Sequence, residues 1–570
     1  MDKNTVVAFF LIAVVIFAWP FYMDLVAPEK PSTTTAEYAP PPVSPTREKV
    51  EASVVTPPSP ILTTAISLAE EKEYLTSIEN DLFQALVSNK NGGSLLSFRL
   101  KQYQTYDSTL VELIDQNNID NLMLSYVSSV DGQKIDLNNY WHIDNYQPSI
   151  KIGENNSISL RFFTSVNSQQ VEKTITFNHN TYQLIIHTNL GALTNFISQG
   201  TYNLFWPGGL PGTEKNKRDD LTYFKGYVYQ AGELHSPKPK AELKMEHLIG
   251  QTDWVAVRTK YFVASLIPEF GAPSSAIGGV VLNGGKDKTN LYSVSVAQDV
   301  NKPSNVSLYL GPLEYQRIKG LEVRLERIMN FGWSFIRPIA KGVLYLLTKM
   351  HNSIPNYGVV LIIFAILVKI LVFPLTKKSH QSTKEMQAIQ PLVNELKEKY
   401  KNNPQKLNQE TMSLYKEHGV NPLGGCLPLL LQMPLLFALF QVFRSTIELR
   451  GAHFVWWIKD LSSPDTIFYL PFNLPIYGDQ VSVLPIVMGI SMFIQQKMMP
   501  AQASGQQKYM SYFMTGFFML LFNNFPSGLN LYYTLFNVLT ILQQKYLTPQ
   551  QHQAVVVPNP PKQKHKKGLK

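Results

Sequence analysis

One ionisable side chain interrupts a long apolar run in the last third of the sequence. Lys369 lies within GVVLIIFAILVKILVFPL at 358–375. A charged group inside a membrane span costs about 2.5–3.5 kcal/mol on insertion scales, so it usually faces protein or water and marks a functional site. Snorkelling is the alternative, because Lys369 lies only six residues, roughly 9 Å of helix, before Leu375. We favour the functional interpretation.

Polar side chains also occur in the neighbouring apolar runs, three or four positions apart where several share a run. They are Gln432, Ser491, Gln495, Ser511, Thr515, Asn530, Tyr533, Asn537 and Thr540. Interhelical hydrogen bonds, each contributing about 0.6 kcal/mol, are the simple explanation for several of them. Polar stripes on most runs, together with a buried cation, instead predict a shared water-filled cavity.

Such a cavity has a definite physical use. A polar peptide crossing hydrocarbon meets a steep desolvation cost, and a wet groove shortens the apolar distance. A fixed positive charge attracts acidic residues of the passenger, more strongly where the dielectric is low. No bond is made or broken. We therefore expect a non-enzymatic protein that needs no cofactor and no metal.

Three other functions fit parts of the sequence. A serine–lysine peptidase would use Lys369 as base and Ser491 as nucleophile, although no local motif supports this pair. A transporter often has inverted repeats, and none is evident. A sugar-binding β domain lacks a convincing aromatic–carboxylate cluster. Zinc sites of common spacing and a P-loop are unsupported, and the single Cys426 forms no intrachain disulfide.

The elements that position these residues are predicted to be six membrane spans. The first lies in 1–24 and is interpreted as an uncleaved signal anchor, with a cleaved signal peptide as the alternative. A Pro-rich linker follows at 25–64. The other five spans fall in 353–549, at 357–375, 427–446, 481–499, 509–524 and 527–547.

Residues 65–317 are predicted to form a β domain. VEKTITF at 171–177 and TYQLIIHT at 181–188 alternate apolar and polar residues around a turn, which indicates a hairpin. SISLRFF at 157–163 and NVSLYLG at 305–311 are further strands. Many short strands without long helical patterns favour a sandwich.

Two amphipathic segments flank the first of the last five spans. In 318–352, Leu321, Leu325 and Ile328 recur at helical spacing near Trp333, which predicts an interfacial helix. In 376–420, an apolar stripe is interrupted by Asn403 and Pro404 and ends at Gly419, which predicts a helical hairpin. This hairpin is either a self-packed loop without a partner or a docking platform or lid.

Lysine placement gives the orientation. The segment 376–426 holds eight lysines and no arginine, and the tail at 550–570 ends in KQKHKKGLK. The segment 447–480 is acidic. The positive-inside rule then places both termini and the hairpin in the cytoplasm and the β domain outside. The net charge of +9 is thereby largely explained by topology. This explanation argues against a general role in binding nucleic acid, although the basic tail can still contact ribosomal RNA or anionic lipid.

Several motifs, in order along the chain, resemble the YidC family. They are VSLYLGP at 306–312, FPLTKK at 373–378, LYKEHGVNP at 414–422, NPLGGCLPLLLQMP at 421–434, WWIKDLSSPD at 456–465 and FPSGLNLYYTLFN at 525–537.

The resemblance implies a six-span bacterial insertase of the Gram-negative inner membrane, an α-helical polytopic protein with a periplasmic β-supersandwich. It implies a groove open to cytoplasm and lipid, nascent membrane proteins as passengers, and action alone or with the Sec translocon. Lys369 matches the groove cation, where most bacterial members carry arginine. Lysine keeps the charge but loses the planar fork of donors. Tyr533 matches a passenger-contacting position.

Overall fold

The computed structural model of the chain describes residues 69–70, 72–154, 156–284, 287–420, 427–474, 477–498 and 505–547. The predicted signal anchor at 1–24, the linker at 25–64 and the basic tail at 550–570 lie outside the described residues, as does Cys426.

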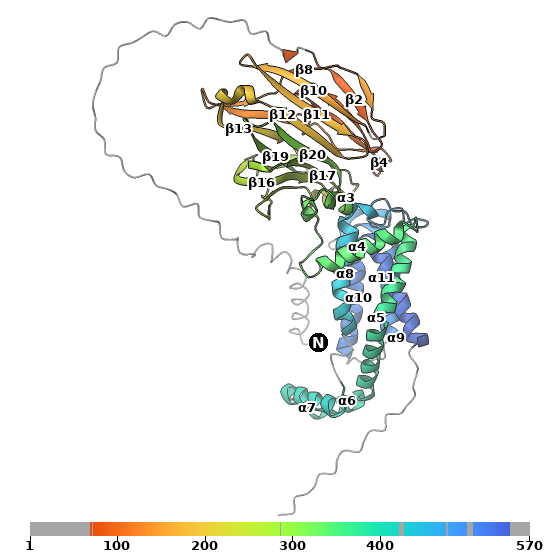
Figure 1. The fold of residues 1–570 in the computed structure, drawn as a ribbon. Coiled ribbons are helices and arrows are strands. Elements are labelled where there is room, and N and C mark those ends of the chain that lie inside the picture. Colours follow the sequence, from red (N-terminus) through yellow and green to blue (C-terminus); the bar gives the residue numbers. More distant parts are fainter. Residues whose placement is uncertain are drawn as a thin grey trace, which may run out of the picture. The chain divides into compact units, whose positions relative to one another are not determined.

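A 15-stranded sheet is the largest element of the described chain (Figure 1). Its main path runs β1-β8-β10-β11-β12-β20-β17-β16-β18-β19-β13-β6-β7, and β14 and β15 join it through β16. The strands are β1 (Ala69–Glu70), β6 (Met123–Ser128), β7 (Lys134–Asp136), β8 (Tyr140–Ile143), β10 (Ser157–Val166), β11 (Gln169–Asn178), β12 (Gln183–Asn189), β13 (Ile197–Trp206), β14 (Lys225–Gln230), β15 (Glu233–His235), β16 (Glu246–Arg258), β17 (Phe262–Pro268), β18 (Ala272–Gly284), β19 (Asp287–Asp299) and β20 (Ser304–Pro312).

The alternating segments of the sequence form strands as predicted. β11 pairs antiparallel with β12, which confirms the hairpin, and β10 and β20 flank this pair. Val171, Ile175 and Phe177 are fully buried, because every second side chain of β11 points into the core. The period-2 pattern therefore identified the inner face of the sheet.

A second, five-stranded sheet covers part of that inner face. It comprises β2 (Leu75–Glu79), β3 (Phe83–Ser88), β4 (Ser94–Gln104), β5 (Leu110–Glu112) and β9 (Ser149–Lys151). The Phe83 and Phe177 rings meet across the interface with centroids 6.5 Å apart. Lys173 Nζ on β11 donates to the Asn91 and Leu122 carbonyls at 3.1 and 2.6 Å. Burial lowers the pKa of Lys173 to about 7. The packed sheets are the sandwich that the strand pattern predicts.

The segment after β20 corrects one expectation. We expected an interfacial amphipathic helix through 318–352, and this is wrong before residue 337. Helix α3 (Tyr315–Lys319) ends at Gly320, a short 3₁₀ turn η2 covers Leu325–Ile328, and α4 begins only at Arg337 and ends at His351. Arg324 and Gly332 have positive φ angles of 63° and 81°, which no α-helix accommodates.

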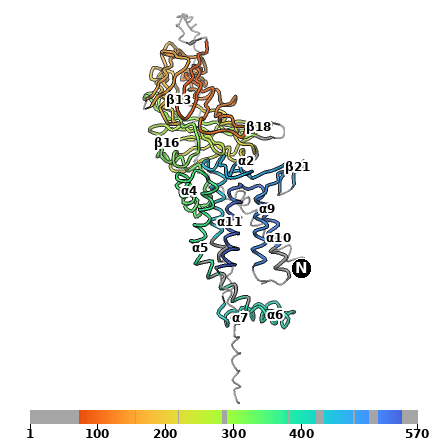
Figure 2. The backbone as a smooth tube through the Cα atoms, turned by 90° about the vertical axis from the view of Figure 1, so that its right-hand side faces the viewer, coloured from red at the N-terminus to blue at the C-terminus, as the bar shows by residue number. Residues whose placement is uncertain are grey.

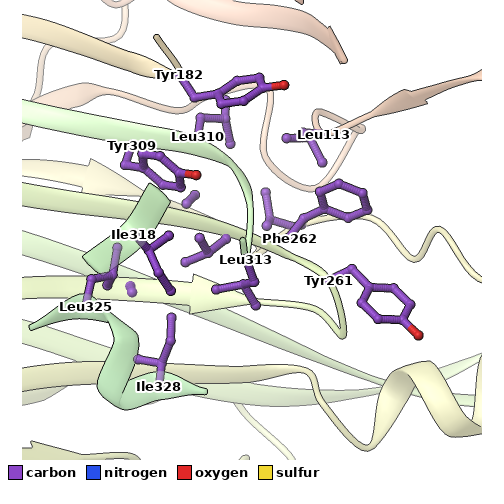
Figure 3. Packing of buried hydrophobic residues seen from close by; sticks show 14 of the residues in the cluster. Leu113, Tyr182, Tyr261, Phe262, Tyr309, Leu310, Leu313, Ile318, Leu325 and Ile328 are labelled. Atoms are coloured by element: carbon purple, nitrogen blue, oxygen red, sulfur yellow. The ribbon is translucent and has the colours of Figure 1, made fainter. Parts of the chain in front are cut away.

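The apolar spacing of that segment has a different cause. Ile318, Leu325 and Ile328 are buried at the edge of the β-domain core, where Figure 3 shows them beside Leu313. Successive short turns can each direct an apolar side chain onto the sheet. The apolar residues then recur every three or four positions, as in an amphipathic helix, although no continuous helix forms. Tertiary packing therefore overrides the local pattern here.

Each of the five predicted spans after residue 353 coincides with a helix. They are α5 (Tyr357–Ala388), α8 (Leu427–Ser445), α9 (Val483–Met498), α10 (Gly505–Phe522) and α11 (Ser527–Leu542), which a π turn, η4 (Gln543–Leu547), extends. Within the described chain, the segment Tyr357–Pro374 is long and apolar enough to cross a membrane, while Val483–Met498 and Tyr512–Phe522 are shorter apolar helices.

The lysine-rich segment is also helical. α5 continues through Pro374 to Ala388, and α6 (Gln390–Lys399) and α7 (Pro404–Glu417) follow. Asn403 Oδ1 accepts the Lys406 amide at 3.1 Å, so the predicted N-cap is confirmed. Gly419 has a φ of 67°, the left-handed conformation that ends a helix.

Candidate functional site

Helix α11 carries several of the polar side chains predicted from the sequence and lies between the helices that carry others. It packs against α5 on one side and α9 on the other (Figures 1 and 2). Asn530, Asn537 and Thr540 are all buried on it. Because these positions are separated by seven and three residues, they lie on one face of the helix, as expected.

Lys369 is buried against this face. Its side chain is 8% exposed, and Nζ donates to Thr540 Oγ1 on α11 at 2.8 Å. The ammonium also lies 4.6 Å from the centroid of the Phe536 ring, a cation–π contact. The lysine therefore points across to the neighbouring helix and not toward the end of its own, so the snorkelling alternative is wrong. Among the described residues, no carboxylate pairs with it.

A second polar contact joins α11 to α9 one turn away. Asn537 Nδ2 donates to Ser491 Oγ at 3.1 Å, and Ser491 Oγ donates to the Met488 carbonyl at 2.6 Å. Thr540 in turn donates to the Phe536 carbonyl at 2.7 Å. The hydrogen bonds thus form two separate sets on α11, one that reaches Lys369 on α5 and one that reaches Ser491 on α9, and the two sets together are called the polar path.

The remaining predicted residues are distributed around this path. Thr515 on α10 is buried and accepts a hydrogen bond from the Gln496 amide of α9. Gln495 on α9 and Gln432 on α8 are partly exposed. Gln495 lies one helical turn after Ser491 on α9. Within the described residues, no hydrogen bond joins either glutamine to Lys369.

Asn530 and Tyr533 occupy the other end of α11. Asn530 is fully buried, and its amide donates to the Phe522 carbonyl at 3.1 Å, where α10 ends. Tyr533 is partly buried and packs edge-on against the Phe522 ring, with centroids 5.4 Å apart. Asn530 is consequently held against the end of α10, whereas Tyr533 is less deeply buried.

Two residues extend the path and were missed in the sequence. Gln543 Nε2 on η4 donates to Thr376 Oγ1 on α5 at 3.1 Å, and both side chains are buried. Thr376 lies seven residues after Lys369, and Gln543 lies three after Thr540. This helical spacing was the available signal, since each continues the polar face of its own helix.

The hydrogen-bond partners of Lys369 and Ser491 argue against the serine–lysine peptidase alternative. Lys369 Nζ is bonded to Thr540, and Ser491 is bonded to Asn537 and Met488, so the two are not partnered with each other among the described residues. A nucleophile and its base must lie within hydrogen-bond reach. No group of three His, Cys, Asp or Glu side chains able to hold a metal occurs in the described segments.

Comparison with known proteins identifies the family. Residues 75–345 match the model described as the YidC periplasmic domain, and residues 349–554 match the model of the 60Kd inner membrane protein. A solved structure titled as an active YidC insertase with its first transmembrane domain resolved is 15% identical, with a TM-score of 0.35, and covers 84% of this chain and 94% of its own.

Relatives of similar length extend the match to the whole chain. A membrane protein insertase YidC of Chloroherpeton thalassium is 37% identical and covers 100% of both chains. One from Chlorobium luteolum is 38% identical over 96% of this chain and 95% of its own. Because this identity extends along essentially the full length, and because the β domain and the helices each match their own model, the chain belongs to the YidC family of membrane protein insertases.

Proposed function

We propose that this chain moves hydrophobic segments of nascent membrane proteins into the inner membrane without forming or breaking a covalent bond. The observation that carries the proposal is Lys369, a buried cation whose partner is a neutral hydroxyl and not a carboxylate. Ionisable side chains inside spans usually pair with one another or with backbone carbonyls. A cation left without a carboxylate partner keeps its attraction for a passing negative charge.

The proposed step follows from electrostatics. An acidic or polar passenger segment entering between α5, α9 and α11 exchanges the Thr540 contact for its own with Lys369. The surrounding low dielectric strengthens that interaction relative to water. Asn537 and Ser491 supply neutral hydrogen-bonding groups along the same route. Gln432, Gln495, Thr515 and Tyr533 are proposed to contact the passenger around it.

Release into lipid needs only the hydrophobic effect. The passenger's apolar segment is more stable in hydrocarbon than beside polar groups, so it partitions outward once its polar end has been accommodated. Nothing in this cycle requires a cofactor or a nucleotide. The groove is proposed to open toward the cytoplasm and the lipid.

The membrane topology and the partners of the chain are also part of the proposal. Six spans place both termini and the hairpin α6–α7 in the cytoplasm, and the domain at 65–317 in the periplasm, as the lysine distribution favours. The Sec translocon is proposed as a partner for larger passengers. The ribosome, through the basic tail and hairpin, and anionic lipids are proposed as further contacts.

The experiment compares passengers that differ only in charge. Proteoliposomes holding the full chain, Lys369→Gln or Lys369→Arg receive a single-span passenger with an acidic translocated tail, or the same passenger with amide replacements. We expect Lys369→Gln to insert the acidic passenger about tenfold more slowly, equivalent to about 1.4 kcal/mol in the barrier. Lys369→Arg is expected to keep the rate.

The neutral passenger is the internal control. Its insertion is expected to change little in Lys369→Gln, because it makes no ion pair. Equal loss for both passengers would mean that the substitution damaged the bundle and not the electrostatic step. Unchanged insertion of the acidic passenger by Lys369→Gln would contradict the proposal.

A further inference from the structure

The connection between α8 and α9 contains a feature that the insertion step leaves unused. Strands β21 (Thr466–Leu474) and β22 (Gly478–Ser482) pair antiparallel as a separate two-stranded sheet. Figure 2 shows β21 extending away from the end at which α9 begins. Most of β21 is exposed, although its sequence, TIFYLPFNL, is apolar.

The exposure involves both faces of the strand. Four large side chains that are more than half exposed are Ile467 (53%), Phe468 (51%), Tyr469 (54%) and Phe472 (57%). Asp479 is the one charged residue between Thr466 and Ser482 in the sequence. Soluble proteins rarely present a contiguous apolar surface of this kind, so a partner must cover it.

A pair of tryptophans precedes the hairpin in the chain and is attached to its base. Trp456 is 82% exposed and stacks on Trp457 with centroids 5.8 Å apart. Trp457 Nε1 donates to Asp465 Oδ2 at 3.0 Å. The same oxygen accepts the Val483 and Leu484 amides at 3.1 and 2.8 Å, which cap the start of α9. One carboxylate thus ties the tryptophans, the base of the hairpin and α9 together.

The other side of the hairpin is attached to the end of α10. Asn523 is buried; its Oδ1 accepts the Ser482 amide at 3.1 Å, and its Nδ2 donates to the Tyr477 and Gln480 carbonyls. Gln480 Nε2 donates to Asn524 Oδ1 at 3.0 Å. These hydrogen bonds attach the hairpin to the end of α10, as Asp465 attaches it to the start of α9. The exposed apolar side chains of the hairpin therefore have a defined position relative to both helix ends.

The chain runs directly from this hairpin into a face suited to lipid. Ile486, Ile490 and Ile494 on α9 lie four residues apart and are 39%, 55% and 44% exposed. β22 ends at Ser482, immediately before that helix. The exposed apolar surface of the hairpin therefore continues the exposed apolar stripe of the helix.

We propose that the β21–β22 hairpin and Trp456 form a lipid-binding surface that lies in the headgroup region of the leaflet on the β-domain side. A two-stranded ribbon has unpaired backbone groups on both outer edges, which excludes it from the hydrocarbon centre. Tryptophan, tyrosine and phenylalanine side chains on a nearly uncharged segment suit the interface instead. Lys215 Nζ of the β domain lies 5.3 Å from the centroid of the Tyr469 ring, so a cation is available beside this surface to attract lipid phosphates.

Depth-resolved fluorescence quenching tests this surface in the full chain. Phe472→Cys, in a Cys426→Ser background, is labelled with an environment-sensitive dye and reconstituted in phosphatidylethanolamine–phosphatidylglycerol vesicles. We expect blue-shifted emission, strong quenching by lipids brominated near the headgroup, and little quenching by aqueous iodide. Ile467→Cys provides a second position on the hairpin and is expected to behave alike.

Two labelled positions calibrate the measurement. Leu371→Cys, on the exposed side of α5, is expected to respond to bromine deep in the acyl chains. Tyr106→Cys, exposed on the β domain, is expected to respond to iodide alone. If the hairpin labels behave like Tyr106→Cys, the surface is in water and the proposal fails. If they are shielded from both lipid bromine and iodide, a protein covers the surface and the proposal also fails.

Discussion

Asp219 and Arg444 join the β domain to helix α8 across 225 residues of sequence. Arg444 Nη2 lies 2.7 Å from Asp219 Oδ1, and Lys260 Nζ lies 2.7 Å from Asp219 Oδ2. Burial alone raises the pKa of the Asp219 carboxyl, but Lys260 and Arg444 outweigh it and hold that pKa below its ordinary value. One carboxylate on α2 (Lys217–Leu221) therefore neutralises a cation from each side of the junction.

Asp219→Asn is expected to loosen this junction. The substitution leaves Lys260, whose side chain is 8% exposed, without its counterion. Breaking a fully buried pair costs about 3–5 kcal/mol, and solvent at the partly exposed Arg444 reduces this to about 1–3 kcal/mol. The measurement is the thermal unfolding midpoint of the purified full chain in detergent.

A surface pair provides the control for that substitution. Asp120 and Lys90 form an ion pair at 2.8 Å with side chains 52% and 33% exposed. Asp120→Asn is expected to change the unfolding free energy by less than about 1 kcal/mol. Similar shifts of the unfolding midpoint for the two variants would show that the Asp219 carboxylate stabilises the protein no more than a surface ion pair does.

Glu448 gives the same junction a dependence on pH. Its Oε1 accepts the Tyr315 amide at 3.2 Å, and its Oε2 is enclosed without a hydrogen-bond partner among the described residues. Burial raises the pKa of Glu448 from 4.5 to about 7. The folded protein thus keeps a proton that the unfolded chain has already released, so the free energy of unfolding falls as pH rises from 4.5 to about 7.

Glu448→Gln is expected to remove that slope. Glutamine keeps an oxygen for the Tyr315 amide and cannot ionise. The free energy of unfolding of the variant should match that of the parent at about pH 5. At about pH 8 it should exceed the parent's value by on the order of 1–3 kcal/mol. Unfolding curves at several pH values measure this. Parallel pH profiles for the two proteins would contradict the assignment.

Local patterns were sufficient for much of this fold. The alternation in 171–177 identified β11 and its buried face, and Asn403 with Pro404 marked the start of α7. Lys369 stood out because one charge in an apolar run is visible without any structure. In each case the signal lies within a few residues, where backbone geometry and side-chain spacing determine the outcome.

Contacts between distant segments were not predictable in this way. Nothing near Asp219 or Arg444 indicates that they meet, and the partners of Lys369 and Ser491 depend on how α11 packs. The hairpin β21–β22 lies in a segment that the sequence marked only as an acidic connection. The helical spacing in 320–336 misled for the converse reason, since packing on the sheet produced it.

Ser491→Ala separates insertion from hydrolysis. Ser491 Oγ accepts one hydrogen bond from Asn537, so its loss removes an interhelical contact of about 0.6 kcal/mol. We expect insertion of a single-span passenger to remain within about threefold of the parent. A serine hydrolase would lose nearly all of its activity. Complete loss of insertion by Ser491→Ala, with the unfolding midpoint unchanged, would contradict this expectation and favour the hydrolase.

Gly92 and Gly132 provide a matched test of packing between the two sheets. Both have positive φ angles, 66° and 71°, so alanine at either position carries a similar backbone cost of about 1–2 kcal/mol. A Cβ at Gly92 would lie 2.8 Å from the buried Trp141 ring, whereas one at Gly132 meets nothing within 4 Å. Gly92→Ala is therefore expected to lower the unfolding free energy by about 1–3 kcal/mol more than Gly132→Ala. Thermal unfolding of the two full-length variants measures the difference, and equal destabilisation would mean that Trp141 moves aside freely and does not fix the spacing of the sheets.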